Sequence, residues 1–238
     1  MKKIILYCTA VFLILSGYTI KAQVDNSKVQ IGTVGEKISD FRLTSLQGKD
    51  VIISDYVGKN IILVFPRGKV LDNVWCAICH YQYAELADME NNDQFRTKFN
   101  VEVLYVLPYV KDSVIKWSDA FQDRLNAIER WKNPKEPEKL SEGQKAWMDF
   151  CRKAFPNKYE YPASNVNLPF PVLMDADHTV SKGFGLLREE WDGTKTQQNV
   201  PTIFIIDKTG TIRFKYHSQT TADRPNAKYL IEFIEKML

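Results

Sequence analysis

Two cysteines spaced two residues apart are the side chains of this sequence best suited to chemistry. Cys76 and Cys79 lie in the stretch Trp75–His80, which reads WCAICH and separates an apolar run from an amphipathic one. This order predicts a strand, a turn and a helix that meet at the two sulfurs. Unpaired N–H groups and the helix dipole favour a thiolate at a helix N-terminus, and a thiol one turn further along can close a disulfide. The spacing therefore predicts a redox-active dithiol.

Other uses of the same motif compete with redox chemistry. A disulfide that spans two residues at a helix start is strained and readily reduced, so it seldom serves as a structural staple. Cys-x-x-Cys-His is also the signature of covalent haem attachment, with His80 as an axial ligand and Met89 or Met174 opposite. The two cysteines with His178 or His217 would suit Cu(I). The order of elements around the pair favours a dithiol that needs neither a metal nor another cofactor.

Apolar patterns predict regular elements on both sides of the dithiol. Residues 61–65 are uniformly apolar, as expected of a central strand buried on both faces, and residues 101–107 form a second such strand. Residues 81–95, between them, have the spacing of an amphipathic helix. A strand–helix–strand unit implies a right-handed crossover that joins two parallel strands.

The remaining patterns complete an α/β fold. Residues 41–53 predict an N-terminal β-hairpin, and residues 111–160 predict a two-helix insertion, because a charged segment with prolines interrupts their helical spacing. A strand at 170–174, a hairpin at 201–216 and a helix at 226–238 follow. We therefore expect one domain, residues 23–238, with a central mixed β-sheet flanked by helices.

The first 22 residues are expected to lie outside the fold. Lys2 and Lys3 precede an apolar run that polar residues interrupt, and Ala22 provides a small residue for cleavage, which is typical of a secretory signal peptide. We expect a secreted or periplasmic protein without stable membrane insertion after cleavage. Cleavage removes three lysines and no acidic residue, so the formal charge of +3 falls to zero. A neutral domain gives no electrostatic reason to expect a nucleic acid partner.

Short phrases in a fixed order along the chain carry a family resemblance. They are Gly35–Phe41, Leu46–Lys49, Gly58–Lys59, Val64–Gly68, Phe170–Asp175, Ile203–Asp207 and Arg224–Pro225. Together with the Cys-x-x-Cys motif, they resemble the thioredoxin-fold redoxins, specifically the AhpC/TSA family that includes the peroxiredoxins. The resemblance covers about residues 33–110 and 168–238 and implies a thioredoxin-like fold.

The thioredoxin side of this resemblance implies a site for a substrate chain. Thioredoxins place a Trp-Cys-x-x-Cys motif opposite a loop with a cis proline, which matches Trp75 and the run Val200, Pro201 and Thr202. A cis peptide before Pro201 would leave the backbone of Val200 free to pair with a substrate strand. The acidic residue that lies beneath a thioredoxin disulfide would fall near Phe65 and is missing.

The peroxiredoxin side implies different roles for the same cysteines. Peroxiredoxins use a Pro-x-x-x-Thr/Ser-x-x-Cys pattern and a loop arginine, so Cys79 takes the peroxidatic position and Cys76 that of the Thr or Ser. The arginine is absent from residues 199–202, and Arg67 is the candidate substitute. The ionisable residues nearest in sequence that could accept a proton from Cys79 are His80 and Glu85.

These observations together predict a thiol–disulfide oxidoreductase of the cell envelope. Cys76 is expected to attack protein or small-molecule disulfides and Cys79 to resolve the mixed disulfide, with electrons from an unidentified donor. One alternative is a thiol-dependent peroxidase in which Cys79 reacts with peroxide and Cys76 or Cys151 resolves it. Cys151 is otherwise expected to be a buried, inert thiol. A second alternative is a non-enzymatic binding protein that uses the insertion at 111–160 as its contact surface.

Overall fold

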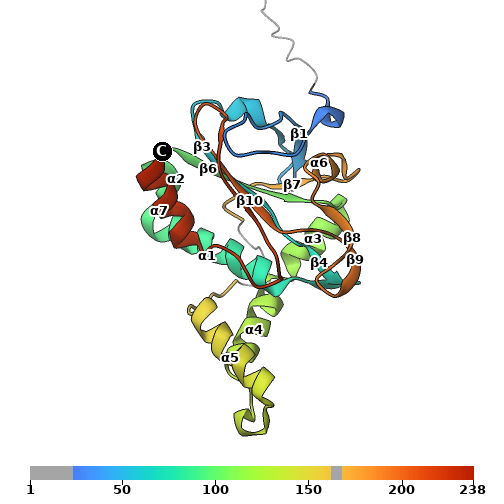
Figure 1. Ribbon diagram of the computed structural model, residues 1–238, viewed down its shortest axis with the longest axis vertical. Coiled ribbons are helices and arrows are strands. Elements are labelled where there is room, and N and C mark those ends of the chain that lie inside the picture. Colours follow the sequence, from blue (N-terminus) through green and yellow to red (C-terminus); the bar gives the residue numbers. More distant parts are fainter. Residues whose placement is uncertain (1–23, 162–167) are drawn as a thin grey trace, which may run out of the picture.

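A seven-stranded mixed sheet forms the centre of the protein (Figure 1). The structure, a computed structural model, describes residues 24–161 and 168–238, so the expected signal peptide lies outside the described residues. The strand order is β11-β10-β3-β6-β7-β1-β2. Its strands are β1 (Arg42–Ser45), β2 (Asp50–Ile52), β3 (Asn60–Phe65), β6 (Val101–Leu107), β7 (Val172–Met174), β10 (Thr202–Ile206) and β11 (Ile212–His217).

The pairing of these strands confirms the expected mixed sheet. β3, β6 and β7 are parallel to one another, whereas β10 pairs with β3 in the antiparallel sense. The predicted hairpins are present as β1–β2 and β10–β11. The helices are α1 (Ala77–Asp93), α2 (Phe95–Lys98), α3 (Lys111–Asp119), α4 (Phe121–Lys132), α5 (Glu142–Ala154), α6 (Thr179–Gly183) and α7 (Ala227–Met237), with 3-10 turns at Asn26–Lys28, Ile53–Tyr56 and Pro137–Lys139.

The central strands are buried on both faces because successive side chains point to opposite sides of a sheet. In β3, Ile62 and Val64 belong to the core formed with α1, α3, α4 and α7. Leu63 and Phe65 belong to the core on the other face, which includes Val180 of α6. This arrangement explains the uniformly apolar run from which a central strand was predicted, and it places the buried C-terminal end of β3 next to the dithiol.

Residues 111–160 form three helices instead of the expected two. The helical spacing continues through Ala120, but the chain bends there. Ala120 is both the C-cap of α3 and the N-cap of α4. α3 belongs to the body, since Val114 and Trp117 are fully buried in the main core. α4 and α5 project from the body as an arm (Figure 1). A capping box of Ser141 and Gln144 begins α5.

A hairpin that was not predicted precedes β10. It consists of β8 (Leu187–Trp191) and β9 (Thr194–Asn199), joined by Asp192 and Gly193, both with positive φ. Asp-Gly between two runs is a strong signal for a tight hairpin turn. Its strands are polar and half exposed, so their hydrophobic pattern is weak. No helix within residues 24–161 or 168–238 has the length and apolar character needed to cross a bilayer.

Candidate active site

The dithiol lies between β3 and α1, as the sequence predicted, and a short hairpin takes the place of the expected turn. After β3, the strands β4 (Lys69–Leu71) and β5 (Val74–Trp75) form a small antiparallel hairpin that returns the chain to the sheet. The N–H of Cys76 donates to the carbonyl of Gly68 over 2.9 Å, which fixes Cys76 as the residue that caps α1. Cys79 lies in the first turn of the helix. Both thiols are free, and Cys76 is 2% and Cys79 0% exposed.

Hydrogen-bond donors converge on the sulfur of Cys79. The backbone N–H of Arg67 donates to it over 3.3 Å, and a guanidinium nitrogen of Arg224 lies 3.8 Å away. The thiol of Cys76 donates a further hydrogen bond. Burial raises the pKa of Cys79, but these three donors and the nearby His80 hold that pKa well below its ordinary value.

Cys76 is polarised in the opposite direction. Its hydrogen bond to Cys79, then burial and the charge of Cys79, raise its pKa well above the usual range. These directions favour the thiolate at Cys79 and the neutral thiol at Cys76. The expectation that Cys76 is the first nucleophile stays a prediction, because the charge of Arg224 lowers the pKa of both cysteines, although its guanidinium hydrogen-bonds to Cys79.

Arg67 contributes through its backbone, while its side chain points to the β8–β9 hairpin. Its guanidinium donates to Gln198 over 2.6 Å and to Thr194 over 2.6 Å, and it packs over the ring of Trp191 at 5.0 Å. It also donates to the hydroxyl of Thr221. Arg67 was the candidate for the arginine whose guanidinium faces the cysteines, but its guanidinium points away from them. It ties the loop after β3 to two distant segments.

Arg224 is the functional residue that sequence reasoning missed. It lies between β11 and α7, and one of its nitrogens donates to the carbonyl of Thr221, the residue whose hydroxyl accepts from Arg67. The phrase Arg224–Pro225 was part of the family resemblance, but nothing near it in sequence indicates that it reaches Cys79. The contact exists because the sheet brings the end of β11 beside the first turn of α1.

The peptide before Pro201 corrects one expectation. Residues 24–161 and 168–238 contain no cis peptide, so the predicted cis bond is wrong. The N–H of Val200 donates to the carbonyl of Leu186 over 2.8 Å, so the residues that flank the β8–β9 hairpin already use a backbone group that was expected to bind a substrate strand. A trans proline suffices here, because the residue directly before a strand needs no ladder hydrogen bond. The hydroxyl of Thr202 donates to the carbonyl of Val200.

Trp75 packs beside the dithiol and is only 5% exposed. Its ring meets the ring of Tyr109 edge to face, with 5.4 Å between centroids, and Lys69 lies over both rings. The hydroxyl of Tyr109 accepts from the N–H of Lys69 and donates to the carbonyl of Gln197. The aromatic pair therefore connects the small β4–β5 hairpin to β9. A substrate-binding role for Trp75 stays a prediction.

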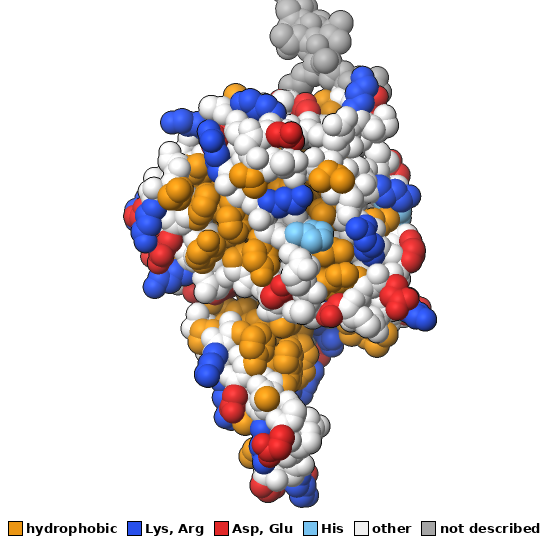
Figure 2. Space-filling model, viewed as in Figure 1, with side chains coloured by type: hydrophobic (Ala, Val, Ile, Leu, Met, Phe, Trp, Pro, Cys, Tyr) orange, Lys and Arg blue, Asp and Glu red, His pale blue; other side chains and the backbone are white. Residues whose placement is uncertain are grey.

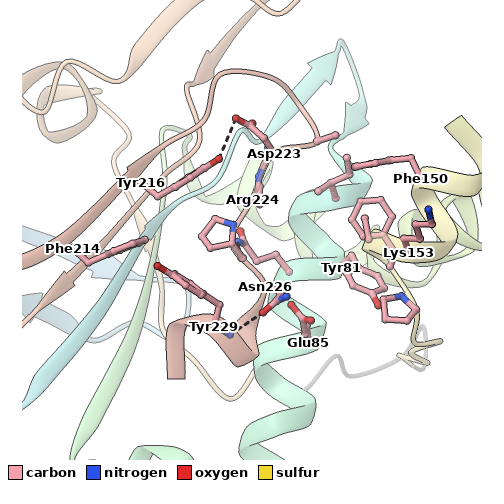
Figure 3. A pocket seen from close by; sticks show the side chains of 17 residues that line it. Tyr81, Glu85, Phe150, Lys153, Phe214, Tyr216, Asp223, Arg224, Asn226 and Tyr229 are labelled. Carbon is pink, nitrogen blue, oxygen red and sulfur yellow. Dashed lines mark hydrogen bonds between the residues drawn. The ribbon is translucent and has the colours of Figure 1, made fainter. Parts of the chain in front are cut away.

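An open groove of about 600 Å³ begins beside Arg224 (Figure 3). Its walls come from α1, the end of α5, β11 and the segment that leads into α7. Ile78, which lies between the two cysteines, and Phe150 of the arm line it, as does Tyr229. Glu85 also lines it and accepts from the N–H of Ala227 over 2.8 Å; burial raises the pKa of Glu85. Figure 2 shows hydrophobic side chains on both sides of the junction between body and arm.

His80 and Cys151 are buried in different surroundings. Each ring nitrogen of His80 lies 2.9 Å from a main-chain carbonyl, so neither can ligate a haem iron without breaking this packing. The described residues also contain no group of three His, Cys, Asp or Glu side chains that could hold a metal, so His178 and His217 do not complete a copper site with the dithiol. Cys151 is fully buried on α5, and burial raises its pKa to about 11.

Comparison with known proteins gives one family and one fold. A sequence model of the AhpC/TSA family matches residues 34–215. Peroxidoxin BcpB from Mycobacterium tuberculosis has a similar structure, with a TM-score of 0.51 and 13% identity over 87% of this chain and 99% of that chain. The mitochondrial 2-cys peroxiredoxin from Plasmodium falciparum has a TM-score of 0.51 and 17% identity over 86% and 94%. A mutant of peroxiredoxin 6 of Arenicola marina has a TM-score of 0.50 and 13% identity over 86% and 73%.

These likenesses confirm the predicted thioredoxin-like fold. No curated protein matches the sequence.

Proposed function

The chain belongs to the AhpC/TSA family, and from that premise we propose that it is a thiol-dependent peroxidase whose attacking sulfur is Cys79. The family makes the protein an oxidoreductase. The observation that carries the finer proposal is the convergence of the Arg67 N–H, the Arg224 guanidinium and the Cys76 thiol on the Cys79 sulfur. A cation in this position favours the thiolate and also stabilises the negative charge that develops on a departing oxygen.

The proposed reaction uses both cysteines in sequence. The Cys79 thiolate attacks one oxygen of a hydroperoxide, the O–O bond breaks, and the alkoxide leaves with a proton as an alcohol. Cys79 is then a sulfenic acid. The Cys76 thiol attacks that sulfur, a disulfide forms between the two, and water leaves. An external thiol must supply the two electrons that restore the dithiol. Both cysteines belong to one helical turn, so the disulfide can form without unwinding the rest of α1.

The burial of the dithiol supports a small oxidant. A sulfur that is 0% exposed is inaccessible to the disulfide of a folded protein unless the site opens, whereas a hydroperoxide group needs little room. The groove beside Arg224 offers an apolar wall for the organic part of such a substrate, and its volume of about 600 Å³ lies within the usual range of ligand pockets.

Thiol–disulfide exchange at the same dithiol is the second candidate. The observation that favours it is that Cys76, the less completely buried of the two cysteines, stands directly after Trp75 and caps the helix. An incoming thiolate would reach Cys76 first and form a mixed disulfide there. This exchange is also the step by which an electron donor would reduce the disulfide in the peroxidase cycle.

The location of the protein is a separate proposal. We propose that residues 1–22 direct export and that the dithiol works outside the cytosol, as the charged and apolar runs of that segment suggest.

Reaction of the reduced protein with stoichiometric hydrogen peroxide and cumene hydroperoxide tests the peroxidase proposal. We expect oxidation at pH 7 to exceed that of an ordinary thiol by roughly 30-fold or more, since a thiol of pKa near 8.5 is only a few per cent ionised there. The Cys76→Ser variant should accumulate a sulfenic acid on Cys79, which a dimedone adduct reports by mass.

The variants that complete this experiment separate the two candidates. Cys79→Ser should lose the fast reaction, and Cys151→Ser, the matched control, should keep it. Oxidation by both peroxides at the rate of an ordinary thiol, together with rapid reduction of a small disulfide, would contradict the peroxidase and support disulfide exchange.

A further inference from the structure

The histidine that directly follows Cys79 is held in a way that only its charged form satisfies. His80 is fully buried on α1. Its Nδ1 lies 2.9 Å from the carbonyl oxygen of Cys76, and its Nε2 lies 2.9 Å from the carbonyl oxygen of Trp117. Carbonyl oxygens accept hydrogen bonds and cannot donate them. A neutral imidazole carries one N–H and one lone pair, so one of the two contacts would set a lone pair against an oxygen.

The ring cannot turn away from these carbonyls. Trp117 of α3 packs against it with 4.9 Å between centroids and 33° between planes, and Phe121 of α4 meets it edge to face at 4.6 Å. The imidazolium form donates one N–H to each carbonyl and satisfies both. The packing therefore selects a protonated ring, provided that a negative charge lies near enough to balance it.

Cys79 is the group that provides this charge. Burial is the largest influence on His80 and lowers its pKa below the ordinary value, although the two carbonyls and the charge of Cys79 act against burial. The geometry of the two carbonyl contacts, which only the imidazolium satisfies, is therefore what favours the charged ring. The other charged neighbours are Arg124 and Asp123 of α4, which hydrogen-bond to each other and so largely cancel. A thiolate and an imidazolium in a buried site stabilise each other and titrate as a coupled pair.

We propose that His80 holds one of the protons that the reaction of the dithiol uses. It is protonated while Cys79 is a thiolate and releases its proton when Cys79 is oxidised. The proposal rests on Cys79 being the thiolate, but it does not depend on which oxidant reacts. It assigns a role to the residue after the second cysteine, which the proposed reaction otherwise leaves unused. His80 acts through Cys79 and is a positioning residue.

This role balances the protons of peroxide reduction. Reduction of a hydroperoxide to an alcohol and water takes two electrons and two protons. The electrons come from the two sulfurs as they form a disulfide. One proton comes from the thiol of Cys76, and the second is the one that His80 gives up when the thiolate beside it disappears. Because both N–H groups of His80 face carbonyls, the proton that reaches the leaving oxygen passes through solvent.

Nitrogen-15 NMR of the histidine rings tests the proposal on the unaltered protein. In the reduced protein at pH 7, both ring nitrogens of His80 should be protonated, and in the disulfide form only one. The chain has three histidines, so His178 and His217 serve as internal controls and should not change with redox state. A His80 ring that is neutral in both states, or protonated in both, would overturn the proposal.

A second readout distinguishes this proposal from the assignment of the thiolate. The pH midpoint of Cys79 alkylation should rise by roughly one unit or more in His80→Gln, because a cation next to the thiolate is lost. An unchanged midpoint overturns the role of His80. An ordinary midpoint near 8.5 in the unaltered protein would instead refute the thiolate at Cys79, on which the proposed function depends. If His80→Gln fails to fold, the NMR measurement decides alone.

Discussion

Arg224 is the side chain that makes the two sulfurs of the dithiol unequal. Its guanidinium lies 3.8 Å from the sulfur of Cys79, and its charge lowers the pKa of both cysteines, but Cys76 donates its own hydrogen bond to Cys79 and so stays protonated. In the proposed reaction, this cation and this hydrogen bond together decide which sulfur is the nucleophile. The chemistry of the site therefore depends on a residue outside the Cys-x-x-Cys motif.

We expect Arg224→Gln to slow the reaction of the protein with peroxide and to shift its pH dependence. Loss of the cation should raise the pKa of Cys79 by roughly 1–2 units. The thiolate exists above the pKa of Cys79, so the rate falls as the pH drops through that value, and a raised pKa moves this fall to higher pH. Rates measured from pH 5 to 9 should show the shift.

Arg188→Gln is the matched control for this prediction. Arg188 is an exposed arginine of β8, and its side chain donates to the carbonyl of Leu187. Its removal should leave unchanged both the pH midpoint of the rate of reaction with peroxide and the maximal rate at high pH. A midpoint for Arg224→Gln that coincides with that of the unaltered protein would show that the guanidinium does not act on the sulfur.

At the scale of the elements, the site is assembled from segments far apart in the sequence. The first turn of α1 carries the cysteines, the loop after β3 supplies the N–H of Arg67, and the segment between β11 and α7 supplies Arg224. The Arg67 guanidinium hydrogen-bonds to residues of the β8–β9 hairpin and to Thr221 in the segment between β11 and α7. It therefore links the loop after β3 to both of them. The hairpin is thus a structural support for the dithiol.

The arm forms one wall of the groove, and Phe150 of α5 is the side chain that tests this. Phe150 stacks on Trp147, is 39% exposed and lines the groove. Phe150→Ala should raise the KM for cumene hydroperoxide by roughly fivefold, since loss of a partly buried ring costs about 1 kcal/mol of binding. The reaction with hydrogen peroxide should not change, because that substrate has no apolar part.

Ile115→Ala provides the comparison for Phe150. Ile115 of α3 is also 39% exposed but does not line the groove, so both peroxides should react with this variant as with the unaltered protein. Equal KM values for cumene hydroperoxide in the two variants would show that the groove does not bind the substrate.

At the scale of the whole molecule, two cores enclose a sheet whose central strands end at the dithiol, and the arm extends from one side of this body (Figure 1). The proposed export of the protein belongs to this scale. Expression of the full chain should yield a periplasmic protein whose N-terminal residue is Gln23, read by mass or by N-terminal sequencing. A variant without residues 2–22 should remain in the cytosol. Recovery of the full chain with residues 1–22 still attached in a membrane fraction would contradict the cleavage.

The sequence by itself determined most elements of the central sheet and the position of the dithiol among them. The strands at 61–65 and 101–107 and the two predicted hairpins follow from local patterns, which depend on neighbours a few residues apart. The helix after Cys79 was also predicted, but residues 77–84 are all buried, so its first turns lack the expected polar face. The polar β8–β9 hairpin was not predicted because its strands have little hydrophobic pattern, although Asp192–Gly193 marked its turn. The bend at Ala120 was not predicted because the helical spacing of apolar residues continues through it without a break.

Only the tertiary structure decided which polar and charged groups surround each sulfur. Arg224 stands 145 residues from Cys79 in the chain, and the N–H of Arg67 reaches the same sulfur because β3 ends directly beneath α1. The use of the Val200 N–H depends in the same way on Leu186, which directly precedes β8. A pKa and a hydrogen-bond partner are set by distances through space, and the sequence does not record which distant residues the sheet brings together.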